Sequence, residues 1–141
     1  MPGNPFVDTN VLVYAVSGAE PEAAKSARAR ALLKAGRVCL STQVLGEFYR
    51  AVTSPRRASP LRHAEAVAWV QLWKHHDVHA LTVAHVDLAL DLCGRYQLNY
   101  YDALIVAAAR LAKSPVLYSE DLSHGQDYGG VRVENPFRAT G

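Results

Sequence analysis

The segment Pro5-Phe6-Val7-Asp8-Thr9-Asn10-Val11-Leu12-Val13-Tyr14 decides the fold, because it contains the end of one element and the start of the next. Phe6-Val7 is typical of the end of a buried strand. The apolar residues that follow the polar break predict a helix, with Thr9 or Asn10 as its N-cap. Asp8 therefore lies between a strand and a helix, where open α/β sheets bind ligands. The same position also suits a residue that only caps a helix or forms a turn. The rest of the sequence is needed to choose between these interpretations.

Length and composition favour one soluble globular domain spanning residues 1–141. Half of the 141 residues are hydrophobic and 20% are charged, which is ordinary for a globular protein. No apolar run reaches the length of a membrane span, and the first residues lack the basic and apolar regions of a signal peptide. We therefore expect a cytoplasmic protein with no membrane contact.

The charge balance limits how nucleic acid could be bound. The formal net charge is only +2, so a basic surface would have to be local. The densest basic patch is a Pro- and Ser-containing loop with Arg56 and Arg57. These two residues are candidate RNA contacts, although such a loop is more commonly plain solvated surface.

Strand-like and helix-like segments alternate along the chain. Short apolar runs predict strands at 38–40, 78–81, 115–118 and 131–133, in addition to the first one. Helical periodicity and caps predict helices at about 21–35, 43–53, 61–74, 82–96 and 100–109. This alternation is typical of an α/β protein, and we predict a three-layer α/β/α sandwich with a central parallel sheet.

Three further acids occupy positions comparable to that of Asp8. Glu47 lies at the edge of the apolar face of the helix at 43–53. Asp102 lies in the first turn of an otherwise apolar helix, where the helix dipole stabilises a carboxylate. Asp121 follows the strand at 115–118, at the same kind of junction as Asp8. Taken singly, each suits an ordinary surface acid or a helix cap.

A parallel sheet would bring these acids together. The carboxyl ends of its strands share one edge, and the N-termini of the crossover helices point at that edge. Several carboxylates at one place cannot all stay ionised unless a bound cation offsets their mutual repulsion. Hard oxygen ligands select Mg²⁺ or Mn²⁺, and such an ion can activate water and stabilise charge on a phosphodiester. The pattern therefore predicts metal-dependent hydrolysis of a nucleic-acid backbone.

These motifs resemble those of the PIN-domain family. The resemblance rests on residues 7–14, the helix with Glu47, Tyr101-Asp102-Ala103-Leu104-Ile105 and Ser119-Glu120-Asp121-Leu122, and it extends from about Phe6 to Phe137. A free-standing domain of this length resembles a VapC-type toxin of a type II toxin–antitoxin pair. The resemblance implies endoribonuclease activity dependent on Mg²⁺ or Mn²⁺. It also implies a homodimer and an antitoxin partner whose C-terminal segment covers the acidic site.

The resemblance assigns roles to single residues. It matches Asp8, Asp102 and Asp121 to the metal-binding acids, and Glu47 to a fourth catalytic acid that often acts through water. Asn10 is expected to hold the carboxylate of Asp8 or a water. Ser119 stands where the family often has Thr and is expected to orient Asp121. The fourth motif lacks the usual second acid and aromatic after its Asp. This departure bears on the binding of a second metal ion and much less on the first.

Other functions share parts of this pattern. A phosphoacceptor receiver domain would need an acidic pair after its first strand and a suitably placed late Lys. A phosphatase with an Asp nucleophile would need Asp at position 10, where this chain has Asn10. A non-catalytic PIN-like binding module, or a PIN nuclease of RNA processing without an antitoxin, stays open. An RNA cleavage assay with and without EDTA separates the catalytic from the non-catalytic classes.

Overall fold

The computed structural model describes residues 3–17 and 21–138. Its strands are β1 (Phe6–Val7), β2 (Cys39–Ser41), β3 (Asp77–His79), β4 (Val116–Tyr118) and β5 (Arg132–Glu134). Its helices are α1 (Thr9–Ala15), α2 (Ala23–Lys34), α3 (Thr42–Thr53), α4 (His63–Trp73), α5 (Val83–Tyr96) and α6 (Tyr100–Leu111). The order of strands and helices is the one expected from the sequence.

The five strands form one parallel sheet in the order β3-β2-β1-β4-β5. Phe6 of β1 is in register with Cys39 of β2 on one side and with Leu117 of β4 on the other. The shortest strand, β1, therefore lies at the centre of the sheet.

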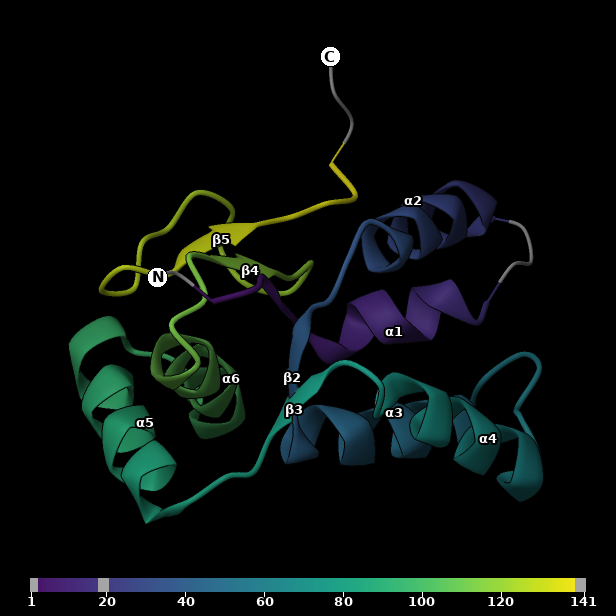
Figure 1. Ribbon diagram of the computed structural model, residues 1–141, viewed down its shortest axis with the longest axis horizontal. Coiled ribbons are helices and arrows are strands. Elements are labelled where there is room, and N and C mark those ends of the chain that lie inside the picture. The colour runs from purple at the N-terminus through teal and green to yellow at the C-terminus, as the bar shows by residue number, and fades with distance from the viewer. Residues whose placement is uncertain (1–2, 18–20, 139–141) are drawn as a thin grey trace.

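The helices cover the sheet in two layers. Helices α1 to α4 lie on one side, whereas α5 and α6 lie on the other (Figure 1). From β1 to β3 the chain moves outward in one direction, and α5 and α6 then carry it back past β1 to β4. Since parallel crossovers are right-handed, this reversal places the later helices on the opposite face. The predicted α/β/α fold with a parallel central sheet is confirmed.

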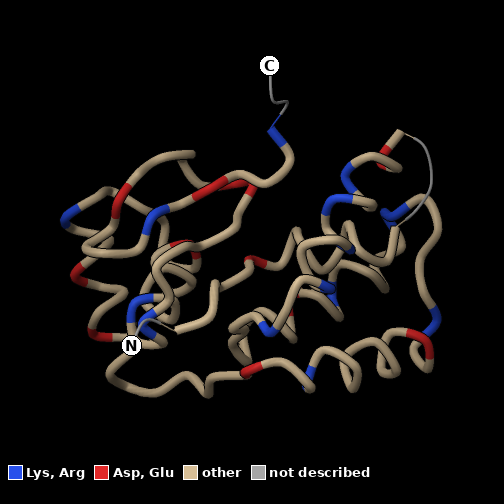
Figure 2. The backbone as a smooth tube through the Cα atoms, turned by 45° about the horizontal axis from the view of Figure 1, so that its top comes forward, with Lys and Arg blue, Asp and Glu red and all other residues tan. Residues whose placement is uncertain are grey.

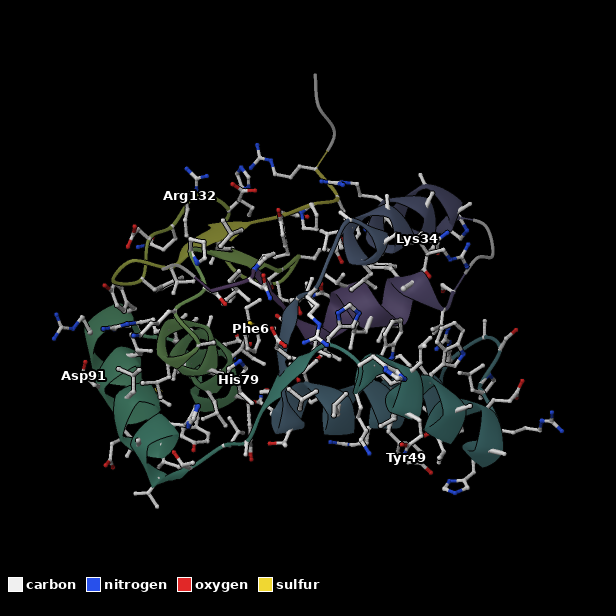
Figure 3. The ribbon with its side chains drawn as sticks, in the orientation of Figure 1. Phe6, Lys34, Tyr49, His79, Asp91 and Arg132 are labelled. Atoms are coloured by element: carbon white, nitrogen blue, oxygen red, sulfur yellow. The ribbon has the colours of Figure 1, made fainter. Side chains whose placement is uncertain are left out.

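The core lies between the sheet and its helices. Phe6 and Leu117 are fully buried, and every residue from Ala103 to Ala109 of α6 is buried, as its apolar sequence predicts. In Figure 3 Phe6 lies at the centre of the molecule, whereas Asp91 and Arg132 lie at its outer edges. Such burial is the main favourable contribution to folding.

The first N-cap differs from the expectation. Asp8 itself caps α1, because its Oδ1 accepts from the Thr9 backbone N–H at 2.7 Å. Thr9 and Asn10 are already helical. Both have side chains that suit an N-cap, but the helix begins at Thr9, directly after Asp8.

Within residues 3–17 and 21–138, no helix combines the length and the apolar character needed to cross a membrane.

Candidate active site

The candidate site lies where the direction of the chain across the sheet reverses. Central strand β1 is followed by Asp8, and its neighbour β4 is followed by Ser119, Glu120 and Asp121. Asp8 N–H donates to the carbonyl oxygen of Tyr118 at 2.9 Å, which joins the two strand ends. In open α/β sheets, such a switch point leaves a crevice at the carboxyl ends of the strands.

Asp8 is a nearly buried carboxylate. Its exposed fraction is 5%, and besides capping α1 it accepts from Ser119 Oγ at 2.8 Å. Burial raises its pKa from 3.8 to about 6, although the bonds from Ser119 and Thr9 act in the other direction. The charges of Asp121 and Glu47 raise this pKa further. Asp8 is thus a capping residue, but one that faces two other acids.

Glu47 reaches the same region from α3. Val44 and Phe48 on the same helix are fully buried, whereas Glu47 is half-buried, as the helical pattern predicts. Its Oε1 accepts from Thr9 Oγ1 at 2.7 Å and its Oε2 from Gln43 Nε2 at 3.1 Å. Thr9 therefore fixes Glu47 directly beside Asp8.

Asp102 reaches the site from the N-terminus of α6. It is not the N-cap, because Asn99 caps this helix by accepting from the Asp102 N–H at 3.0 Å. Asn99 Nδ2 also donates to Asp102 Oδ2 at 2.7 Å. Burial raises the pKa of Asp102, and the charges of Asp121 and Glu47 raise it further, against the bond from Asn99.

Asn10 and Ser119 have partners that were only partly expected. Asn10 was expected to hold the Asp8 carboxylate or a water, and its Nδ2 instead donates to Asp121 Oδ2 at 3.1 Å. Ser119 was expected to orient Asp121, and its hydroxyl accepts from the Asp121 backbone N–H at 3.2 Å while it also donates to Asp8. Each polar residue thus links the β1 junction to the β4 junction across the switch point.

The structure brings the four predicted acids within electrostatic reach of one another. Asp121 and Glu47 each raise the pKa of both Asp8 and Asp102. No ion pair in the described ranges joins a Lys or Arg to any of the four. Their mutual repulsion is therefore balanced only by neutral hydrogen-bond donors.

The donor set fits a hard dication in chemistry. All four groups are carboxylates, which Mg²⁺ and Mn²⁺ prefer. Over the part of the chain described, however, no three or more His, Cys, Asp or Glu side chains are grouped closely enough to hold a metal ion. The acids instead bond to Thr9, Asn10, Asn99 and Ser119. Mg²⁺ usually keeps several waters in its coordination shell, so direct contact from every acid is not required.

The loop with Arg56 and Arg57 follows α3, the helix that carries Glu47. A hollow of about 300 Å³ is lined by Glu47, Arg50, Ala51 and Ser54. Arg56 is exposed beyond it, whereas Arg57 is half-buried, with its Nη1 buried and unpaired among the described residues. Figure 2 shows Lys and Arg spread along the chain, with Asp and Glu among them.

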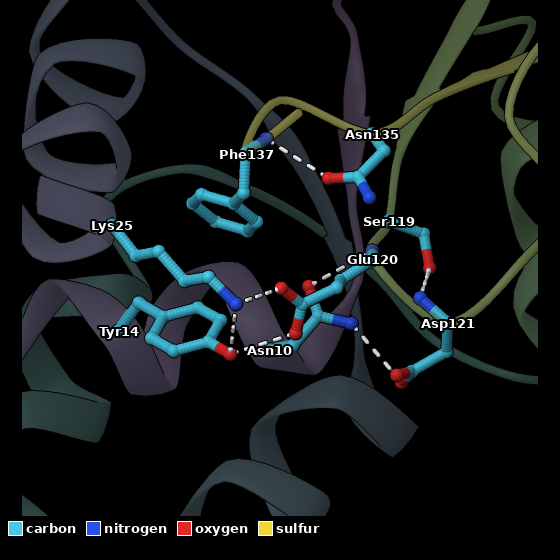
Figure 4. Close-up of polar contacts among 8 residues, drawn as sticks. All are labelled: Asn10, Tyr14, Lys25, Ser119, Glu120, Asp121, Asn135 and Phe137. Carbon is cyan, nitrogen blue, oxygen red and sulfur yellow. Dashed lines mark hydrogen bonds and ion pairs between the residues drawn. The ribbon is translucent and has the colours of Figure 1, made fainter. Parts of the chain in front are cut away.

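Two further sets of residues at the site were not predicted from the sequence. Thr9, Gln43 and Asn99 hold the acids, and their polar side chains one to four residues from an acid were an available signal. Tyr14, Lys25 and Glu120 form a second polar cluster beside Asp121 (Figure 4). Nothing in the sequence pairs Lys25 with Glu120, because 95 positions separate them.

Fold and site together define a class: a parallel α/β domain with acids from four elements gathered at its switch point. The family model of the PIN domain matches residues 6–125. The chain belongs to the PIN-domain family, and the predicted family is confirmed.

Two solved structures share this fold. A toxin–antitoxin complex from Klebsiella pneumoniae matches with a TM-score of 0.73 at 17% sequence identity, covering 96% of this chain and all of that one. VapC20 of Mycobacterium tuberculosis, a toxin that cleaves the sarcin-ricin loop, matches with a TM-score of 0.68 at 24% identity, covering 84% and 90% of the two chains. No curated protein sequence matches the chain.

Proposed function

We propose that this protein is a metal-dependent endoribonuclease and the toxin of a type II, VapBC-type toxin–antitoxin system. The observation that carries the proposal is the gathering of Asp8, Glu47, Asp102 and Asp121 at the switch point of a PIN fold. Both structural neighbours are described as toxins or toxin complexes, which supports the same biological role.

Asp8, Asp102 and Asp121 would hold Mg²⁺ or Mn²⁺, with Glu47 acting through a water. The bound ion would supply a water of lowered pKa and stabilise negative charge on the phosphate. Ser119 and the Thr9 N–H keep Asp8 fixed, while Asn10 and Asn99 orient Asp121 and Asp102. These neutral donors hold the carboxylates in place and leave their negative charge for a cation.

The proposed substrate is RNA, which would lie across the acidic site toward the loop of Arg56 and Arg57. The hollow over α3 supports this path, because it joins Glu47 to Arg50 and to the start of that loop. Exposed guanidinium groups there would contact the backbone phosphates.

The proposed partners are an antitoxin and a second copy of this chain, in the cytoplasm. The Klebsiella neighbour, which this chain matches over that protein's whole length, is part of a toxin–antitoxin complex. A homodimer is supported by α5, where Val83, Val86 and Leu90 are 75%, 37% and 58% exposed. Their spacing places them on one face of the helix.

An RNA cleavage assay tests the proposed activity. The purified protein is incubated with end-labelled RNA in Mg²⁺, in Mn²⁺ and in EDTA, and the new ends are sequenced. We expect cleavage at discrete positions with either metal, and none in EDTA or with Asp8→Asn. The matched control Asp91→Asn alters an exposed acid paired with Arg95 on α5 and should cleave normally. Undiminished cleavage in EDTA, or intact RNA in all conditions, would contradict the proposal.

A growth assay tests the biological role. Expression of the chain in a bacterial test strain should arrest growth, whereas expression of Asp8→Asn should not. Co-expression of the protein encoded beside it should restore growth. If growth continues while the RNA is cleaved in vitro, the protein is a PIN nuclease but not a toxin.

A further inference from the structure

Glu120 lies between Ser119 and Asp121, yet its side chain turns away from the acidic site. In Figure 4 it points toward α1 and α2, whereas Asp121 points to the other side of Asn10. Its Oε1 accepts from the Tyr14 hydroxyl at 2.7 Å, and its Oε2 lies 2.5 Å from Lys25 Nζ. Two helices that precede the loop by about a hundred residues thus hold this one side chain.

Tyr14 and Lys25 are themselves fixed. Lys25 Nζ lies 3.3 Å from the Tyr14 hydroxyl and 5.0 Å from the centre of the Tyr14 ring. The ring of Phe137 packs edge-on against Tyr14 at 4.8 Å between centroids. The Glu120 side chain is 26% exposed, so the ion pair is partly shielded from water. A shielded pair with a second neutral donor holds its geometry better than an exposed pair does.

The backbone of Glu120 is held by Asn10, on the side of the acidic site. The Glu120 N–H donates to Asn10 Oδ1 at 3.4 Å, and Asn10 Nδ2 donates to Asp121 Oδ2. The loop that follows β4 contains no helix or strand before β5, so its own secondary structure does not fix these residues. The direction of Asp121 therefore depends on its own bonds to Asn10 and Ser119 and, through the adjoining backbone, on what holds Glu120.

We propose that Tyr14, Lys25 and Glu120 form a clamp that positions Asp121 for metal binding. This inference rests on the proposed function. The three are positioning residues, because they act through Asp121. Loss of hydrogen bonds that orient metal-binding side chains commonly weakens metal affinity tenfold or more.

Calorimetric titration with Mn²⁺, in the absence of RNA, tests the clamp. Glu120→Gln and Lys25→Met remove the ion pair at nearly constant volume, and both should weaken Mn²⁺ affinity about tenfold. Tyr14→Phe removes one hydrogen bond and keeps the ring packing, so a smaller loss of affinity is expected. Lys25→Arg keeps the charge and should bind Mn²⁺ nearly as the wild type does. Asp91→Asn, which breaks the exposed pair with Arg95, should leave the affinity unchanged.

Thermal melting in EDTA separates positioning from loss of fold. The clamp variants should melt cooperatively near the wild-type temperature. If Glu120→Gln and Lys25→Met do not fold, the Mn²⁺ affinity of Tyr14→Phe tests the clamp. Wild-type affinity in the folded variants would overturn the clamp while leaving the proposed function intact. A wild-type protein that binds no Mn²⁺ at millimolar concentration would overturn the proposed function, and the clamp with it.

Discussion

Asp8 combines two demands that oppose each other in the metal-free protein. As an N-cap it stabilises α1, but as a buried carboxylate facing Asp121 and Glu47 it is costly to ionise. Its pKa is raised from 3.8 to about 6. The stability that protonated Asp8 gives is therefore fully present below pH 3.8 and is lost as the pH rises through about 6.

Replacement of Asp8 by Asn should stabilise the metal-free protein at neutral pH while abolishing activity. Asn is also a good N-cap and carries no charge. A raised pKa of this size corresponds to about 3 kcal/mol at pH 8, or an increase in melting temperature on the order of 10 °C. The gain should disappear below pH 4, where Asp8 is protonated. Thermal melting of both proteins in EDTA from pH 4 to pH 8 measures this gain. An Asp8→Asn variant that is less stable than the wild type at pH 8 would contradict the raised pKa of Asp8.

At the scale of elements, two neutral histidines hold helix and strand ends. His85 Nδ1 accepts from the Thr82 N–H at 3.1 Å at the start of α5, and His76 Nδ1 accepts from the Val38 N–H at 3.2 Å before β2. Burial lowers the pKa of both groups, helped by His79 for His85 and by Arg37 for His76. Their stabilisation is present above the ordinary histidine pKa of 6.5 and is lost as the pH falls through the lower native values.

Replacement of His85 by Gln should remove part of this acid sensitivity. Gln at the third helical position can accept the same backbone N–H and does not titrate in this range. We expect the stability difference between wild type and variant to shrink or reverse from pH 7 to pH 5, as measured by urea unfolding. Contributions from distant groups such as Asp8 cancel in this difference. A difference that does not change with pH would exclude His85 as a titrating cap.

The loop between α3 and α4 gives a second prediction at this scale. Arg56 is exposed, whereas Arg57 is half-buried with a buried Nη1. Arg56→Ala should lower the slope of log affinity against log salt by roughly 0.7, the value for one phosphate contact on single strands. Arg57→Ala should change it less. Binding is measured in the Asp8→Asn background, which is expected not to cleave, so that the RNA stays intact. Equal slopes for Arg56→Ala, Arg57→Ala and the Asp8→Asn parent would show that the loop is only solvated surface.

The elements were more predictable than the contacts between them. Periodicity was sufficient to predict helix α3, and the apolar run of residues 103–109 was sufficient to predict that α6 is buried. The full set of partners of Asn10 and Ser119 was not predictable. Each could reach either of two acids, and the register of β1 against β4 decides which one. The different directions of Glu120 and Asp121 likewise depend on α2, which lies far away in the sequence.

At the scale of the whole molecule, the topology produces the site. Because the crossover through α5 and α6 returns to the opposite side of β1, two strand ends carrying acids become neighbours. Glu47 and Asp102 then enter from helices on opposite faces of the sheet. This is why the alternation of strands and helices was sufficient to predict that acids remote in sequence lie at one edge of the sheet.

The exposed apolar face of α5 should determine the oligomeric state. Leu90→Glu places a charge in the proposed dimer interface and should convert a dimer into a monomer in light scattering at micromolar concentration. Leu72→Glu on α4 is the matched control, because Leu72 is 50% exposed on a different helix. A wild-type monomer, or an unchanged dimer for Leu90→Glu, would rule out dimerisation through this face.

Anomalous diffraction from crystals soaked in Mn²⁺, collected at the manganese edge, measures the metal site itself. An anomalous peak within coordination distance of the carboxylates of Asp8, Asp102 and Asp121, absent from crystals of Asp8→Asn, is the predicted result. A fully soaked crystal with no peak at the carboxyl ends of β1 and β4, or with its peak elsewhere on the protein, would contradict the account.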